Sequence, residues 1–151
     1  MKQQGWVVHP LRVRYQETDQ MGVVFHANYL TWLEMGRTEW VRQHGFTYKE
    51  MEDKGVLLPI IDLQCKFVSP ARYDDHVIVC TTLTESSRLQ MKFTAQIRKV
   101  DEAIATTTTL VDDPLPGELL VQAETNHVFV NKQLKPIRIL KIMPELASIL
   151  T

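Results

Sequence analysis

Residues 13–34 read VRYQETDQMGVVFHANYLTWLE, and this stretch combines three different patterns. Residues 11–15 alternate as Leu-Arg-Val-Arg-Tyr, which predicts a strand with its apolar side chains on one face. Residues 16–22 are mostly polar and end on a glycine, which predicts a loop. From residue 28 onward the apolar residues recur at steps of three and four, which predicts a helix. The fold is therefore expected to begin as strand, loop and long helix.

The predicted helix has a broad, mostly aromatic apolar stripe. Its members are Tyr29, Trp32, Leu33, Gly36 and Trp40. Asn28 is the predicted N-cap, because its side chain can accept a hydrogen bond from the first turn, and Gly45 is the predicted end of the helix. A glycine inside the stripe costs helix stability, so Gly36 is expected to allow close approach of another backbone.

Strand patterns dominate the rest of the chain. Thr47 followed by Glu50 has capping-box spacing and predicts a short helix over residues 46–54. Strands are predicted over residues 57–68, 76–85, 89–100 and 118–130. The remaining predictions are a strand extension with a proline-stiffened loop over residues 101–117 and a terminal helix over 138–150, interrupted near Pro144.

Helix and strand patterns are segregated along the chain rather than alternating. This order favours an α+β fold, with a curved antiparallel sheet packed against one long helix. The 151 residues suffice for one core, and no repeat or linker interrupts the pattern. Residues 1–151 are therefore expected to form a single domain.

Composition and charge narrow the classes of function. The formal net charge is -1, which provides no overall field for binding nucleic acid. The sequence has no apolar run of about 18 residues and no signal-peptide pattern at residues 1–6, so we expect a cytoplasmic protein without a transmembrane segment. Cys65 and Cys80 lie in apolar stretches and lack the spacing of zinc ligands, so they are expected to be buried, reduced thiols, with no metal bound.

Asp19 and His26 are the candidate reactive side chains, on either side of an apolar Val-Val-Phe run at the predicted helix entrance. Free N–H groups at a helix N-terminus can polarise a carbonyl group or hold an oxyanion. A carboxylate nearby can attack that carbonyl or activate water. Ester-type hydrolysis needs this combination. The competing interpretation is a turn aspartate beside a surface histidine.

Residues 13–34 also resemble the signature of the 4-hydroxybenzoyl-CoA thioesterase-like family, and are most similar to its bacterial branch associated with the Tol–Pal system. Further matches follow at residues 37–39, 67–75, 125–131 and 135–136, so the resemblance covers about residues 10–140. It implies the hotdog fold and hydrolysis of an acyl-CoA to free acid and CoA. It also implies that no bound cofactor is needed.

The resemblance assigns roles to individual residues. Asp19 matches the family's catalytic aspartate, His26 a histidine typical of this branch, and Tyr15 an aromatic residue that lines the site. The amide that polarises the carbonyl is expected at the N-terminus of the long helix. Glu17 stands where the family more usually has Asp. The resemblance further implies a homodimer or homotetramer, in which Asp19 of one chain faces the helix N-terminus of the other.

Other polar residues are assigned structural uses at this stage. Glu34 is a second candidate carboxylate, but pairing with Arg37 at i, i+3 is favoured. His127 lies among apolar strand residues and is expected to be a hydrogen-bonded core histidine. Ser69 and Pro70 can lie near the ligand or form only a bend. The candidates for contacts with CoA phosphates, each of which can equally be a solvated charge, are Lys66, Arg88, Lys92, Lys132 and Lys135.

Two other functions remain open on the sequence alone. One is a dehydratase or hydratase acting on acyl carriers, since the same fold supports that chemistry. The other is a non-catalytic acyl-binding or scaffold protein. The pattern also leaves open whether Asp19 is a nucleophile or a general base, and whether the acyl group is aliphatic or aromatic.

Overall fold

The computed structural model describes residues 5–102, 104 and 107–150. Its sheet is antiparallel and has six strands in the order β2-β6-β4-β3-β1-β5. The strands are β1 (Trp6–Arg12), β2 (Ile60–Phe67), β3 (His76–Ser86), β4 (Gln90–Lys99), β5 (Thr109–Val111) and β6 (Glu118–Val128). The helices are α1 (Ala27–Gln43), α2 (Tyr48–Asp53), α3 (Ile139–Ile142) and α4 (Ala147–Leu150), with 3-10 turns at η1 (Tyr15–Glu17) and η2 (Pro144–Leu146).

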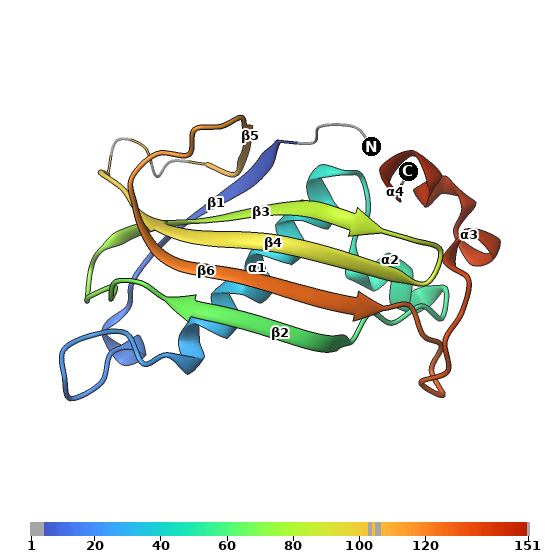
Figure 1. Cartoon of the computed structure of the whole chain (residues 1–151), viewed down its shortest axis with the longest axis horizontal. Coiled ribbons are helices and arrows are strands. Elements are labelled where there is room, and N and C mark those ends of the chain that lie inside the picture. Colours follow the sequence, from blue (N-terminus) through green and yellow to red (C-terminus); the bar gives the residue numbers. More distant parts are fainter. Residues whose placement is uncertain (1–4, 103, 105–106, 151) are drawn as a thin grey trace.

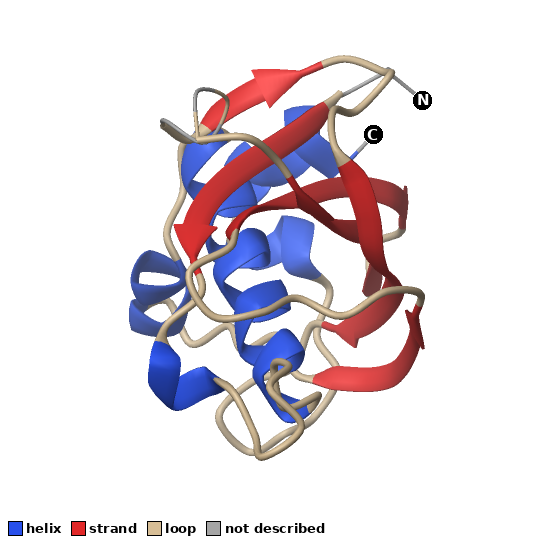
Figure 2. Ribbon diagram, turned by 90° about the vertical axis from the view of Figure 1, so that its left-hand side faces the viewer, coloured by secondary structure: helices blue, strands red, loops and turns tan. Residues whose placement is uncertain are grey.

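The long helix α1 lies along the concave face of the curved sheet, as Figures 1 and 2 show. Its predicted stripe is buried: Trp32, Leu33 and Trp40 are at most 2% exposed. At Gly36 an added Cβ would lie 2.5 Å from the Thr81 hydroxyl oxygen on β3. The expected close approach at this glycine is therefore confirmed, as is the α+β class.

The ends of the predicted helices agree with the structure in some places and differ in others. Gly45 follows the end of α1 with a φ of +93°, and Thr47 caps α2 by accepting a hydrogen bond from the Glu50 amide, as expected. The prediction of Asn28 as N-cap is wrong, because α1 begins at Ala27. The Asn28 side chain instead donates from Nδ2 to the Glu17 carbonyl oxygen at 2.8 Å.

The first strand ends earlier than predicted, at Arg12 rather than at Tyr15. The cause is local: the Glu17 carboxylate accepts a hydrogen bond from the Arg14 amide at 2.8 Å, which closes a 3-10 turn and stops the strand. Tyr15 becomes the first residue of that turn.

Two later segments also depart from prediction. Within residues 101–117, β5 pairs with β1 as a separate edge strand rather than extending a neighbouring one, while residues 103, 105 and 106 lie outside the described chain. The expected terminal helix is divided into α3, η2 and α4, and Pro144 is the first residue of the middle turn.

Strand β2 forms an edge of the sheet and pairs only with β6 among the described strands. Every residue of β2 except Cys65 is exposed. Its exposed apolar side chains are Ile60, Ile61, Leu63 and Phe67, each at least 37% accessible. An unpaired edge of this length and apolarity is a template for pairing with another chain. Separately, no helix in the described chain is long and apolar enough to cross a membrane.

Candidate active site

Asp19 is held in a tight turn between η1 and α1. Its amide donates to the Val23 carbonyl oxygen at 2.9 Å, and its carboxylate Oδ1 accepts a hydrogen bond from the Met21 amide at 2.8 Å. Gly22 supplies the left-handed backbone that this turn needs, with a φ of +80°. One carboxylate oxygen is therefore used to fix the side chain. The other, Oδ2, has no hydrogen-bond donor among the described residues and is free to act on a ligand.

Glu17 forms hydrogen bonds that hold this turn against α1. It was not identified as a site residue from the sequence. Its Oε1 binds the Arg14 amide and its Oε2 accepts from the Trp32 indole N–H, both at 2.8 Å. Its carbonyl oxygen accepts from the Phe25 amide at 2.9 Å and from the Asn28 side chain at 2.8 Å. Burial alone would raise the pKa of Glu17, but the hydrogen bonds from Arg14 and Trp32 outweigh it and lower that pKa. A charged Glu17 thus joins the turn to α1.

A cavity of about 460 Å³ lies beside Asp19 and is called the Asp19 cavity below. Its lining residues are Asp19, Met21, Val23, Val24, His26, Tyr29, Phe67, Val68, Ser69 and Pro70. The structure therefore brings together Asp19 and His26, as the sequence predicted. It also places Ser69 and Pro70 beside the cavity.

His26 precedes the first residue of α1, and its exposed ring lies between two aromatic side chains. The ring centroids are 4.6 Å from Phe25 and 6.1 Å from Phe67. In the described chain, the amides of His26 and Ala27 have no hydrogen-bond acceptor, whereas the Asn28 amide is bound to the Phe25 carbonyl. The N-terminus of the 17-residue α1 thus presents free N–H groups, and a partial positive charge, next to the Asp19 cavity.

Tyr29 and Phe67 complete the apolar wall; both lie in segments that match the family, but neither was singled out as a site residue. The Tyr29 hydroxyl accepts a hydrogen bond from the Ala71 amide at 3.0 Å, and its ring centroid is 5.7 Å from that of Phe67. Burial raises the pKa of Tyr29, so the phenol stays neutral. Tyr29 was predicted as a core residue because its position fits the helix stripe, and it is indeed buried.

Tyr15 lies on the surface of the single chain, and its predicted role in lining the site stays a prediction. It is 76% exposed, packs edge-on against Tyr73, and is not among the residues that line the Asp19 cavity. The early end of β1 turns its side chain outward. Asp19 and His26, which precedes α1, border the same cavity in one chain, and the expected division of the site between two chains stays a prediction.

A second cavity, of about 300 Å³, lies towards the other end of α1 and is called the Arg37 cavity below. Its lining residues are Glu34, Arg37, Tyr48, Met51, Glu52, Val56, Leu57, Leu58, Ile60 and His127. The predicted Glu34–Arg37 ion pair does not form in the described chain. Both side chains border the cavity instead.

Two polar side chains of the Arg37 cavity, Arg37 and His127, are buried, and Tyr48 is partly buried. Burial lowers the pKa of Arg37, whose guanidinium donates to the Tyr48 hydroxyl, and raises the pKa of Tyr48 to about 12. Burial also lowers the pKa of His127 to about 4, so its ring is neutral at pH 7. The His127 nitrogens lie 3.1 Å from the Leu58 carbonyl oxygen and 2.9 Å from the Thr125 hydroxyl. The prediction of a hydrogen-bonded core histidine is confirmed.

The remaining candidates are placed as follows. Lys92 pairs with Glu85 at 3.2 Å, so it is engaged within the chain, while the four other basic candidates, Lys66, Arg88, Lys132 and Lys135, are exposed. Cys80 is buried and free as expected, whereas Cys65 is only partly buried.

Comparison with known proteins places this geometry in a family. The model of the thioesterase superfamily matches residues 21–106, more than half of the chain. The chain belongs to this superfamily. The Bacillus subtilis protein YneP, whose name assigns it provisionally to the acyl-CoA thioesterases, is 35% identical over 136 residues, covering 89% of this chain and 88% of its own. The Escherichia coli acyl-CoA thioester hydrolase YbgC is 32% identical over 95 residues, covering 63% of this chain and 71% of its own.

The solved structures of this superfamily agree with the observed architecture. The DHNA-CoA thioesterase from Staphylococcus aureus superposes with a TM-score of 0.81 at 29% identity, covering 95% of this chain and 87% of its own. The hotdog fold expected from the resemblance is therefore confirmed. Membership of the Tol–Pal-associated branch stays a prediction.

Proposed function

We propose that this thioesterase hydrolyses an acyl-CoA to the free acid and CoA, with Asp19 as its catalytic carboxylate. The observation that carries the proposal is the meeting of a fixed carboxylate and free helix amides beside one cavity. The amides of His26 and Ala27 would polarise the thioester carbonyl and stabilise the oxyanion formed from it. Oδ2 of Asp19 is the oxygen left free for the reaction.

Two routes use the same carboxylate. As a general base, Asp19 takes a proton from water, the resulting hydroxide attacks the carbonyl carbon, and the C–S bond breaks to release CoA thiolate, which is then protonated. As a nucleophile, Asp19 attacks the carbonyl carbon and expels the thiolate, and water then hydrolyses the acyl-Asp19 anhydride. Mass measurement of the chain after an acid-quenched single turnover separates them, because only the second route acylates the protein.

The other residues of the Asp19 cavity position the reacting groups. His26 lies at the helix entrance, where it orients the attacking water or the thioester. Tyr29 and Phe67 form an apolar wall that excludes bulk water from the thioester. In this proposal residues 1–151 act as one domain in the cytoplasm, and the reaction needs no resident metal or cofactor.

We propose that the active assembly is a homodimer formed along β2. This strand presents a free hydrogen-bonding edge and four exposed apolar side chains, and a two-fold axis is the simplest way to pair it. Two β2 strands would then join two sheets into one continuous sheet. Two such dimers can associate further into a homotetramer.

Release of free thiol from a series of acyl-CoA chain lengths tests the function directly. The purified chain should release one CoA thiol for each acid formed. A dehydratase or hydratase would change the acyl group without releasing thiol, and an acyl-binding protein would bind the thioester unchanged. Either of those results would contradict the proposal.

A further inference from the structure

The Asp19 carboxylate and the free amides at the start of α1 belong to two separate pieces of structure. Residues 17–25, called the Asp19 turn below, fold back on themselves. At the base of this turn the Phe25 amide donates to the Glu17 carbonyl oxygen at 2.9 Å, and nearer its tip the Asp19 amide donates to the Val23 carbonyl oxygen, also at 2.9 Å. The helix α1 begins only after the turn has closed. The distance from the carboxylate to the helix amides therefore depends on how the turn is held against α1.

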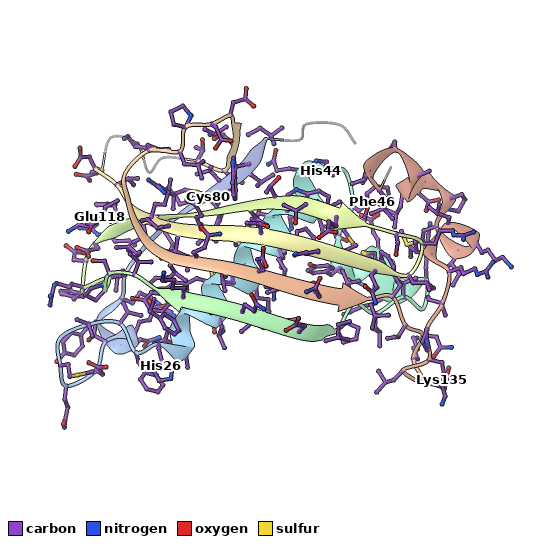
Figure 3. All side chains as sticks on the ribbon, in the orientation of Figure 1. His26, His44, Phe46, Cys80, Glu118 and Lys135 are labelled. Carbon is purple, nitrogen blue, oxygen red and sulfur yellow. The ribbon has the colours of Figure 1, made fainter. Side chains whose placement is uncertain are left out.

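Two side-chain hydrogen bonds join the Asp19 turn to α1. The Glu17 carboxylate Oε2 accepts from the Trp32 indole Nε1 at 2.8 Å, and the Asn28 side chain donates to the Glu17 carbonyl oxygen at 2.8 Å. Glu17 is 6% exposed and Trp32 is 1% exposed. Figure 3 shows His26 at the N-terminal end of α1, on the opposite side of the molecule from Lys135. The turn is therefore attached to the helix from inside the protein, close to the proposed site of reaction.

We propose that Glu17 and Trp32 are positioning residues for the thioester hydrolysis, and that their hydrogen bond holds the Asp19 carboxylate at the distance from the helix amides that the reaction requires. Neither residue lines the Asp19 cavity, so both act through Asp19 rather than on the substrate. This inference rests on the proposed function, in which Oδ2 of Asp19 reacts and the amides of His26 and Ala27 hold the carbonyl oxygen.

A buried carboxylate is an unusual choice for a side chain that only fills space. Removing the Glu17 carboxylate from water costs free energy that an apolar side chain of the same size would not cost. Its two oxygens offset this cost through hydrogen bonds from the Arg14 amide and the Trp32 indole. Hydrogen bonds to a charged acceptor are short and directional. They fix the orientation of the turn, whereas apolar contacts alone would let it slide.

Trp32 is itself held in place by the core. Its ring packs edge-on against Tyr29 with the ring centroids 5.2 Å apart, among the buried residues between α1 and the sheet. Tyr29 in turn lines the Asp19 cavity, and its hydroxyl accepts a hydrogen bond from the Ala71 amide at 3.0 Å. One buried cluster therefore fixes both the donor to Glu17 and one wall of the cavity.

Small displacements of the turn are sufficient to impair the reaction. Bond formation needs reacting atoms about 3–3.5 Å apart, and a misplacement of about 1 Å can lower the rate on the order of 100-fold. Loss of the Trp32 bond should displace the carboxylate by less than this, because the Asn28 bond to the turn remains. We therefore expect a loss of about 10-fold in kcat. KM should change little, because neither Glu17 nor Trp32 lines the cavity.

A pair of matched tryptophan substitutions tests the role of the hydrogen bond. Trp32→Phe removes the donor to Glu17 and keeps an aromatic ring in the core. Trp40→Phe is the control, because Trp40 lies on the same helix, is 2% exposed, and has an indole Nε1 without a hydrogen-bond partner in the described chain. Both changes remove the same volume. The kcat for thiol release should fall by about 10-fold in Trp32→Phe and stay close to the wild-type value in Trp40→Phe.

Double substitutions separate positioning from a general loss of structure. Glu17→Gln weakens the same hydrogen bond from the acceptor side, so combining it with Trp32→Phe should lower kcat no more than the larger single loss. Adding Trp32→Phe to Asp19→Asn should not lower the residual kcat further, because the carboxylate that is positioned is already gone. Destabilisation alone would instead lower kcat by the same factor in both backgrounds.

Two results would overturn the inference while leaving the proposed function in place. One is the same kcat for Trp32→Phe and Trp40→Phe when Asp19→Asn is strongly impaired. The other is an equal loss from Trp32→Phe with and without the Asp19 carboxylate. A fully active Asp19→Asn chain would instead contradict the proposed function, and the positioning role with it. If Trp32→Phe does not fold, Glu17→Gln takes its place in the same comparisons, and an unchanged kcat in that variant would overturn the inference.

Discussion

The two cavities along α1 differ in how their polar groups are held. In the Asp19 cavity, a backbone amide of the same turn fixes one oxygen of the Asp19 carboxylate and leaves the other oxygen free for a ligand. The neighbouring helix amides are unpaired. In the Arg37 cavity, Arg37 and His127 are buried, and burial lowers the pKa of both and raises the pKa of Tyr48. The first arrangement suits bond making and breaking. The lining of the second includes no residue from the N-terminal end of α1, so the comparison favours the Asp19 cavity for the proposed chemistry.

Asp19→Asn gives the largest expected effect. The amide is nearly isosteric but can act neither as base nor as carboxylate nucleophile, so kcat for thiol release should fall by at least ~100-fold. Circular dichroism and thermal unfolding should match the wild type. Asp53→Asn, on the surface of α2, serves as control. Activity retained in a correctly folded Asp19→Asn chain would remove Asp19 from the mechanism.

His26→Ala should lower kcat by less than Asp19→Asn does, because His26 orients a reactant and does not form or break the bond. We expect a loss on the order of 10-fold, below the range for removing an acid or base. The two variants are compared on one acyl-CoA under the same conditions. A reversed order of the two defects would transfer the role of essential base to His26.

Glu17→Gln tests whether the Glu17 carboxylate, which joins the turn to α1, is charged. The amide keeps the shape but weakens the hydrogen bonds from Arg14 and Trp32, so the free energy of unfolding at pH 7 should fall by about 1–3 kcal/mol. The folded-state pKa of Glu17 is lowered, so its stabilisation is present above the unfolded pKa and is lost as pH falls through the folded value. The variant and the wild type should therefore converge in stability in acid. Parallel stability curves down to the acid transition would contradict a charged Glu17.

His127→Gln gives an effect that is confined to one range of pH. The folded-state pKa of His127 is about 4 and its ordinary value is 6.5, so the unfolded chain takes up a proton first as pH falls. Wild-type stability should therefore decline between pH 6.5 and 4 by up to about 3 kcal/mol from this residue, at 1.36 kcal/mol per pKa unit. Gln keeps a donor and an acceptor but does not titrate. Chemical denaturation across this range should show a flatter curve for the variant, and curves with the same slope would contradict a neutral buried His127.

The helix stripe and the two candidate reactive residues could be predicted from the sequence. The stripe from Tyr29 to Trp40 and the glycine at position 36 follow from periodicity and sterics, and the structure confirms them. Asp19 and His26 were found because they flank a short loop next to a helix start, so proximity along the chain ensures proximity in space.

The failures have a different origin. The end of the first strand and the cap of the long helix were mispredicted because the Glu17 carboxylate accepts from the Arg14 amide and the Glu17 carbonyl oxygen accepts from the Asn28 side chain. Local propensity does not reveal such contacts. The Arg37 cavity draws its lining from α1, α2, β2 and β6, so no local motif marks it. Glu34 and Arg37 were expected to pair at i, i+3, but the burial of Arg37 depends on elements far away in the sequence.

The central claim is that the active assembly is a dimer formed along β2, and one measurement tests it most directly. Leu63→Arg places a charge at the middle of the exposed edge strand, where it would lie closest to its own two-fold copy. Sedimentation velocity and thiol release are measured on the same samples over a range of concentrations. The account predicts that specific activity rises and falls with the dimer fraction, and that a monomeric variant is inactive although folded. Full specific activity in a chain shown to sediment as a monomer would contradict it.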